Sequence, residues 1–142
     1  MRLVVYGTLR KNGPLSWALP RHLGEYEVME VSGLRLYVLG DVPGAKLGSE
    51  SDKAVVELWE LNLSKAKELA LLRMLDRMEG VRYGLYERSY INTPKGKALV
   101  YTYCGNVERC LQIRDWEAWQ KKSYREKAQM LKGTLEVGIS II

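Results

Sequence analysis

The chain has 142 residues, of which 46% are hydrophobic and 27% are charged, a balance typical of a folded globular protein and unlike a disordered segment. Lys and Arg number 22 against 17 Asp and Glu, and the net charge of +5 is spread along the chain. No apolar run approaches the roughly 18 residues of a membrane span, and the N-terminus lacks the pattern of a secretory signal. We expect one domain over residues 1–142, in the cytoplasm and away from membranes.

Cysteine and histidine are scarce, which excludes several kinds of site. Cys104, Cys110 and the single histidine, His22, do not have the spacing of a zinc site. A serine or cysteine triad would have to recruit His22, which lies near the start of a predicted strand, where a surface or packing role is more common. We expect reduced thiols and no metal or cofactor.

Apolar and polar residues alternate in several short segments rich in Val, Leu, Tyr and Trp, which is the pattern of half-buried strands. These segments are 2–6, 25–31, 34–39, 55–61, 85–91 and 98–103. Gly33 separates the second from the third, and Pro94 and Gly96 separate the last two, so two antiparallel hairpins are predicted. The segment from Gly40 to Lys53 has three glycines and a proline, and we predict a mobile loop there.

Helical periodicity appears in two later segments, and with the strands it predicts an α+β fold. The first helix is predicted over 64–78, capped by Asn62 or Ser64 and ended by Gly80. Its apolar face is Leu69, Leu72, Met74, Leu75 and Met78. The second, a C-terminal amphipathic helix, is predicted over 114–131, with a stripe of Trp116, Trp119, Ser123, Lys127 and Leu131. The tail 134–142 alternates like a last strand or a free sheet edge.

The first candidate site follows the first strand, at Tyr6, Gly7, Thr8 and Leu9. Glycine permits a positive φ and a close approach of a ligand, and consecutive backbone N–H groups in such a turn can bind a carboxylate or phosphate. A strand followed by glycine is also a common turn. Taken alone, the motif leaves both interpretations open.

The second candidate site is the end of the first helix, where Asp76 and Glu79 lie three residues apart on one face. Tyr83 and Tyr86 follow in the loop and the next strand. Both carboxylates are compatible with a solvated helix end. However, a helix C-terminus is the negative end of the dipole and disfavours added anions, so a functional Glu79 is an alternative.

Together these stretches resemble the gamma-glutamylcyclotransferase-like superfamily, in particular its AIG2-like, gamma-glutamylamine cyclotransferase branch. The resemblance rests on "VYGTLRKNGPL", on "LRLYVLGDVPGAKLG" and "VVELWEL", and on "LDRMEGVRYGLYERSYI". It covers roughly residues 2 to 105, and 110–142 form a C-terminal extension with no firm match. The loop "RKNGPL" is one residue longer than the family's pattern, and Val56 stands where the family often has glycine.

The resemblance implies a small, mostly antiparallel β-barrel with flanking helices, and a small-molecule gamma-glutamyl substrate. Tyr6, Gly7, Thr8 and Leu9 match the loop that holds the substrate's α-carboxylate and amino end. Glu79 matches the catalytic glutamate, and Tyr86 matches a supporting aromatic position. In the family's reaction the substrate's α-amine attacks its own γ-carbonyl, which releases 5-oxoproline and an amine, with Glu79 as general acid and base. No metal or cofactor is implied.

Two other functions remain open at this stage. One is a non-catalytic protein of the same fold that binds small carboxylates. The other is a basic interaction module that uses the C-terminal helix, for example with nucleic acid. The second is disfavoured, because the basic residues alternate with Glu117 and Glu126 as on an ordinary solvated face. The chain is compatible with a monomer or a homodimer.

Overall fold

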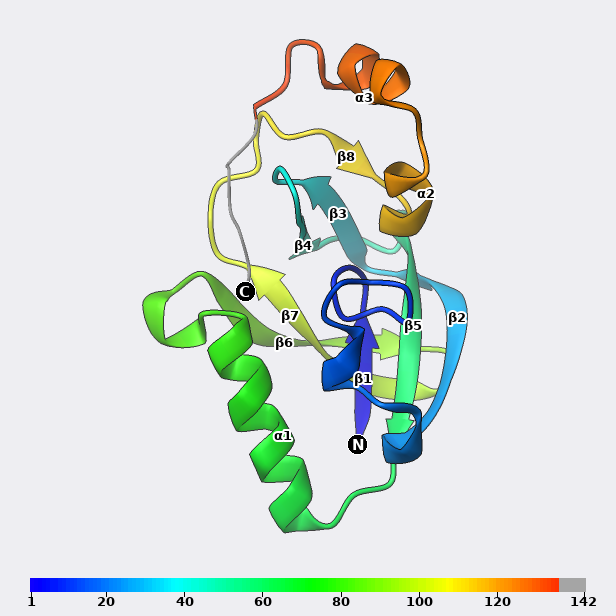
Figure 1. Ribbon diagram of the computed structural model, residues 1–142, viewed down its shortest axis with the longest axis vertical. Helices are drawn as coiled ribbons and strands as arrows, with labels where there is room; N and C mark the ends of the chain where they lie inside the picture. The colour runs from blue at the N-terminus through cyan, green and yellow to red at the C-terminus, as the bar shows by residue number, and fades with distance from the viewer. Residues whose placement is uncertain (136–142) are drawn as a thin grey trace.

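The computed structural model describes residues 1–135, whose strands form two sheets with helices outside them (Figure 1). The larger sheet, in the order β2-β5-β1-β7-β6, contains β1 (Arg2–Val5), β2 (Gly24–Ser32), β5 (Lys53–Leu61), β6 (Tyr86–Thr93) and β7 (Gly96–Tyr103). The smaller, in the order β4-β3-β8, contains β3 (Leu34–Val38), β4 (Pro43–Leu47) and β8 (Gln112–Ile113). The helices are α1 (Lys65–Met78), α2 (Trp116–Gln120) and α3 (Tyr124–Leu131), with 3-10 turns η1 (Ser16–Ala18), η2 (Arg21–Leu23) and η3 (Val81–Tyr83).

The predicted α+β class is confirmed, and each predicted strand appears near its expected position. The central strand β1 pairs antiparallel with β5 and parallel with β7, and its last three residues are buried. Among residues 1–135, no helix combines the length and apolar character that a membrane crossing requires. The predicted terminal strand over 134–142 lies almost wholly outside the described residues.

The predicted closed barrel is wrong, because the strands form two open sheets. The edge strands β2 and β6 do not pair with each other. They approach only through side chains, as where Lys95, in the turn after β6, contacts Glu27 of β2 at 2.9 Å. The chain leaves β2 at Gly33 and enters the second sheet, so no strand closes the first.

The predicted hairpin at Gly33 is also wrong, whereas the later hairpin is confirmed. Strand β2 pairs along its whole length with β5, and β3 pairs with β4. Gly33, with φ of +83°, therefore turns the chain from one sheet to the other. Strands β6 and β7 pair antiparallel through the turn that contains Gly96.

The segment from Gly40 to Lys53 contains the strand β4, which contradicts the predicted mobile loop. Val42, Pro43, Gly44 and Ala45 are buried. A Cβ atom at Gly44 would lie 2.6 Å from the Leu39 side chain, so this glycine allows close packing. Glycine and proline therefore belong to a buried strand here and not to a mobile loop.

Residues 114–131 form two short helices instead of the single predicted helix. Asp115 caps α2, and Ser123 caps α3 in a reciprocal capping box with Glu126. This second cap begins a new helix inside the apolar pattern. Trp116 and Trp119 pack against Val38 of β3, while α3 has no buried residue.

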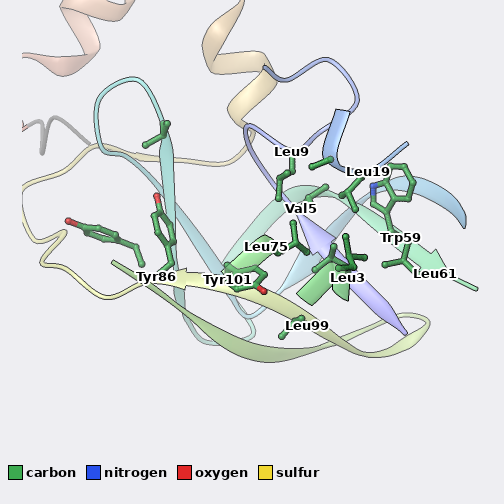
Figure 2. Packing of buried hydrophobic residues seen from close by; sticks show 14 of the residues in the cluster. Leu3, Val5, Leu9, Leu19, Trp59, Leu61, Leu75, Tyr86, Leu99 and Tyr101 are labelled. Atoms are coloured by element: carbon green, nitrogen blue, oxygen red, sulfur yellow. The ribbon is translucent and has the colours of Figure 1, made fainter. Parts of the chain in front are cut away.

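Helix α1 begins and ends where predicted, at the cap Ser64 and before Gly80, whose φ is +62°. Its buried residues are Leu71 and Leu75, whereas Leu69, which was predicted to face the core, is 48% exposed. Leu75 points into the main core cluster beside residues of β1, as Figure 2 shows. This packing presses the C-terminal half of α1 onto the larger sheet.

The different burial of two leucines on α1 gives a test of this packing. Leu75→Ala should lower the free energy of unfolding by about 2–5 kcal/mol, because it leaves a cavity in the core. Leu69→Ala is the matched control and should change it by no more than about 0.5 kcal/mol. Urea unfolding of both variants measures the difference. Equal losses would contradict the orientation of α1 described here.

Candidate active site

One narrow cavity is lined by the residues to which the family resemblance gave a role, but not by Asp76 or Tyr83. Those lining residues are Tyr6, Gly7, Thr8, Leu9, Glu79 and Tyr86. The cavity's empty space, open solvent at the mouth included, is about 360 Å³, and the centre of a water-sized sphere can reach only about 20 Å³ of it. Its lining combines the end of β1 and the loop after it with the end of α1 and parts of β4, β6 and β7. These residues are Val4, Val5, Tyr6, Gly7, Thr8, Leu9, Pro43, Glu79, Tyr86 and Tyr101.

The glycine after β1 is explained by a close approach of another strand. Gly7 does not adopt a positive φ. A Cβ atom there would lie 2.4 Å from Cγ of Pro43 and 2.9 Å from its Cδ, so a larger residue would push β4 away. The absence of a side chain therefore allows the loop and β4 to form one edge of the cavity.

Beyond Gly7, the loop has backbone donors without partners. The carbonyl oxygens of Gly7 and Thr8 accept bonds from the N–H groups of Arg10 and Leu15, at 3.0 and 2.8 Å. In contrast, the N–H groups of Gly7, Thr8 and Leu9 donate to no group within residues 1–135. Successive free N–H groups beside a cavity are suited to hold an anion.

A buried ionic cluster fixes the far end of this loop. Arg10 is 5% exposed and contacts Asp115 at 2.9 Å, Glu117 at 3.1 Å and Glu57 of β5 at 3.6 Å. Glu57 also accepts hydrogen bonds from the backbone N–H of Lys11, at 2.9 and 3.1 Å. The loop is thus tied both to the sheet and to the start of α2. The sequence analysis missed this cluster.

Glu79 is the C-cap residue of α1 and is 9% exposed. Its carboxylate makes no hydrogen bond or ion pair with any other group of residues 1–135. Burial without a partner raises the pKa of Glu79 to about 7. Such a group can accept and release a proton near neutral pH.

Asp76, the other carboxylate of this helix end, lies outside the cavity lining. It accepts two hydrogen bonds from Arg88, at 2.8 and 2.6 Å, and one from the Tyr101 hydroxyl at 2.6 Å. The Arg88 hydrogen bonds hold the pKa of Asp76 below its ordinary value. Its unfavourable position at the helix end is therefore offset by a cation, whereas Glu79 has no such compensation.

Two tyrosines complete the polar part of the cavity. Tyr6 donates its hydroxyl hydrogen to the carbonyl oxygen of Tyr101 at 2.7 Å, and Tyr86 donates to that of Pro43 at 2.8 Å. Burial, and to a lesser degree the charge of Glu79, raise the pKa of both phenols. Both phenols stay neutral, and both lie close enough to Glu79 for its charge to affect their pKa.

Pro43 and Tyr101 also line the cavity, and the sequence analysis assigned neither to a site. Pro43 lies in a segment whose composition predicted a loop, and Tyr101 looks like an ordinary strand residue. For metals, no group of three His, Cys, Asp or Glu side chains in residues 1–135 could hold an ion. His22 is exposed in η2, and Cys104 and Cys110 are free thiols.

Known proteins similar to this chain belong to one family, and the similarity covers most of the chain. Residues 3–121 match the family model described as "Gamma-glutamyl cyclotransferase, AIG2-like", which extends through α2. A gamma-glutamylcyclotransferase family protein, YtfP of Citrobacter rodentium, is 36% identical over 110 residues, which cover 76% of this chain and 86% of the relative. YtfP of Escherichia coli K12 is 32% identical over 120 residues, which cover 82% and 96%.

Solved structures show the same fold. The crystal structure of an uncharacterised protein from Pyrococcus horikoshii matches with a TM-score of 0.64 and 26% identity, covering 84% of this chain and 92% of that one. The solution structure of Escherichia coli YtfP matches with a TM-score of 0.56 and 31% identity, covering 85% and 100%. The chain therefore belongs to the AIG2-like gamma-glutamyl cyclotransferase family.

Proposed function

We propose that this protein is a gamma-glutamyl cyclotransferase that converts a small gamma-glutamyl amide to 5-oxoproline and a free amine. The observation that carries the proposal is the pairing, in one cavity, of free backbone N–H groups at Gly7 to Leu9 with the buried, unpartnered carboxylate of Glu79. Membership of the family supports the same class of chemistry.

The loop after β1 binds the substrate's α-carboxylate in this proposal. Within residues 1–135, no cationic side chain lines the cavity, since Arg10 is turned away into its own ionic cluster. The N–H groups of Gly7, Thr8 and Leu9 are therefore the donors for that anion. Holding this end fixes the α-amine near the γ-carbonyl of the same molecule, and this proximity accelerates ring closure.

Glu79 then moves the protons. Its carboxylate accepts a proton from the substrate's α-ammonium, which frees the nitrogen lone pair to attack the γ-carbonyl carbon. A new C–N bond closes the five-membered ring, and the old amide C–N bond breaks. Protonated Glu79 gives its proton to the departing nitrogen, which leaves as a free amine. The ring nitrogen then loses its second proton to the Glu79 carboxylate, which passes it to the released amine or to water. A pKa of about 7 suits these proton transfers at neutral pH.

Tyr6 and Tyr86 support this chemistry as neutral walls of the site. Because each donates its hydroxyl hydrogen to a backbone carbonyl, each presents only oxygen lone pairs to a ligand. Those lone pairs are suited to accept hydrogen bonds from the substrate's ammonium group. The apolar ring surfaces also limit water around Glu79, which maintains its raised pKa.

The role of Glu79 is tested by substitution. Glu79→Gln keeps the shape of the side chain but cannot accept the proton, so 5-oxoproline formation from a panel of gamma-glutamyl amides should fall by about 10²–10⁴-fold. Glu68→Gln, near the opposite end of α1, is the matched control and should retain wild-type rates. Activity that survives Glu79→Gln would rule out this mechanism. A wild-type protein that binds glutamate analogues calorimetrically but releases no 5-oxoproline would instead be a carboxylate-binding protein.

The raised pKa of Glu79 also predicts a pH dependence of stability. The folded state binds this proton more tightly than the unfolded state, so Glu79 contributes stability at low pH that is lost as pH rises from 4.5 through about 7. The unfolding free energy of Glu79→Gln, minus that of the wild type, should therefore rise across this window by up to about 3 kcal/mol. Chemical denaturation at several pH values measures it. If this difference in unfolding free energy does not change with pH, or falls, the pKa of Glu79 is not raised by burial.

A further inference from the structure

Three polar side chains from three elements meet behind the cavity. Asp76 of α1 accepts the paired hydrogen bonds of Arg88, from β6, and the hydroxyl hydrogen of Tyr101, from β7. We call Asp76, Arg88 and Tyr101 the brace. Among them only Tyr101 lines the cavity. The proposed chemistry assigns no role to any of the three side chains.

Each member of the brace is close in the chain or in space to a residue of the site. Asp76 precedes Glu79 by about one helical turn, and Arg88 follows Tyr86 by two residues on the same strand. Tyr101 makes two contacts with different parts of the site: its hydroxyl bonds to Asp76, and its carbonyl oxygen accepts the hydrogen bond of Tyr6. The brace thus connects α1, β6, β7 and the end of β1.

Two unfavourable terms favour movement of the last turn of α1 away from the sheet. Glu79 loses solvation in the cavity and gains no ion pair, and Asp76 adds a negative charge at the negative end of the helix dipole. Opening this turn would let water reach Glu79. The bidentate Arg88 contact and the Tyr101 hydroxyl oppose that opening, because both would be broken by it.

We propose that Asp76, Arg88 and Tyr101 are positioning residues that hold the last turn of α1 against the sheet and thereby keep the Glu79 carboxylate inside the cavity. Their catalytic importance rests on the proposed function. Their effect on the environment of Glu79 does not, and can be measured without any substrate.

To interpret a titration of Glu79, one needs to know which titratable and charged groups lie near it. They are the phenols of Tyr6, Tyr86 and Tyr101, which are neutral at the relevant pH, with Pro43 from β4. Arg82 and Tyr83 of η3 are exposed, and Arg77 on α1 is exposed as well. The nearby charges that a substitution in the brace can alter are those of Asp76 and Arg88.

Tyr101→Phe tests the brace without changing any charge. The Glu side-chain carboxyls are labelled with ¹³C, Glu79 is assigned through Glu79→Gln, and its pKa is measured by NMR titration. Loss of the hydroxyl should let the helix end open, so the pKa of Glu79 should fall from about 7 towards the ordinary glutamate value. The spread of amide signals shows that the variant is folded.

Arg88→Gln gives an independent test in which two explanations predict opposite signs. Removal of a nearby cation should by charge alone raise the pKa of Glu79, whereas loss of the brace should lower it. Arg73→Gln, an exposed arginine of α1, is the charge-matched control and should leave it unchanged. An unchanged pKa in Tyr101→Phe and Arg88→Gln, or a rise in Arg88→Gln, would overturn the proposal.

Kinetics separate this proposal from the proposed function. If the wild type forms 5-oxoproline, both brace variants should lower kcat by about 10-fold or more and change KM by less than about 2-fold, because the loop that binds the carboxylate is untouched. A rise in KM with unchanged kcat would contradict positioning of Glu79. If the wild type forms none while the Glu79 titration shifts as expected, the proposed function fails and the positioning role stands.

Discussion

The site depends on a carboxylate that is largely removed from water and given no partner. Burying Glu79 costs free energy, since a charge in this cavity has little solvation and no counter-ion. The core packing of Leu75, one turn earlier on the same helix, holds the helix against the sheet and makes this burial possible. The result is a group that exchanges protons near neutral pH. A salt-bridged glutamate in the same place would stay ionised at neutral pH and would not suit the proton transfers that we propose.

On the opposite side of the cavity, the loop after β1 is held in place by ion pairs. A loop with unpaired N–H groups needs to be held by contacts other than its own hydrogen bonds. Here the buried Arg10 connects the loop to Glu57 of β5 and to Asp115 and Glu117 at the start of α2. The buried charge of Arg10 is tolerated because these carboxylates surround it. The N–H groups of Gly7 to Leu9 therefore remain available for a ligand.

Local patterns predicted much of this fold, and the errors arise where distant contacts decide the outcome. Alternation located the strands, but Pro43 lies in a strand whose composition is that of a loop, because β3 and Tyr86 hold it in place. The cap at Ser123 divides a helix that the apolar pattern made continuous. For the site, two local motifs pointed to the residues of one cavity. Two partners of Arg10, Asp115 and Glu117, lie more than a hundred residues away in the chain, and no local pattern pairs them with it.

The most direct test of the central claim is to observe where a substrate's carboxylate binds. A ¹⁵N-labelled Glu79→Gln variant, which binds without turnover, is titrated with a gamma-glutamyl amide while the backbone amide signals are followed. We expect the largest shifts at Gly7, Thr8 and Leu9. The contradicting result is that these amides do not move, whether nothing binds or the shifts gather elsewhere, such as around Trp119.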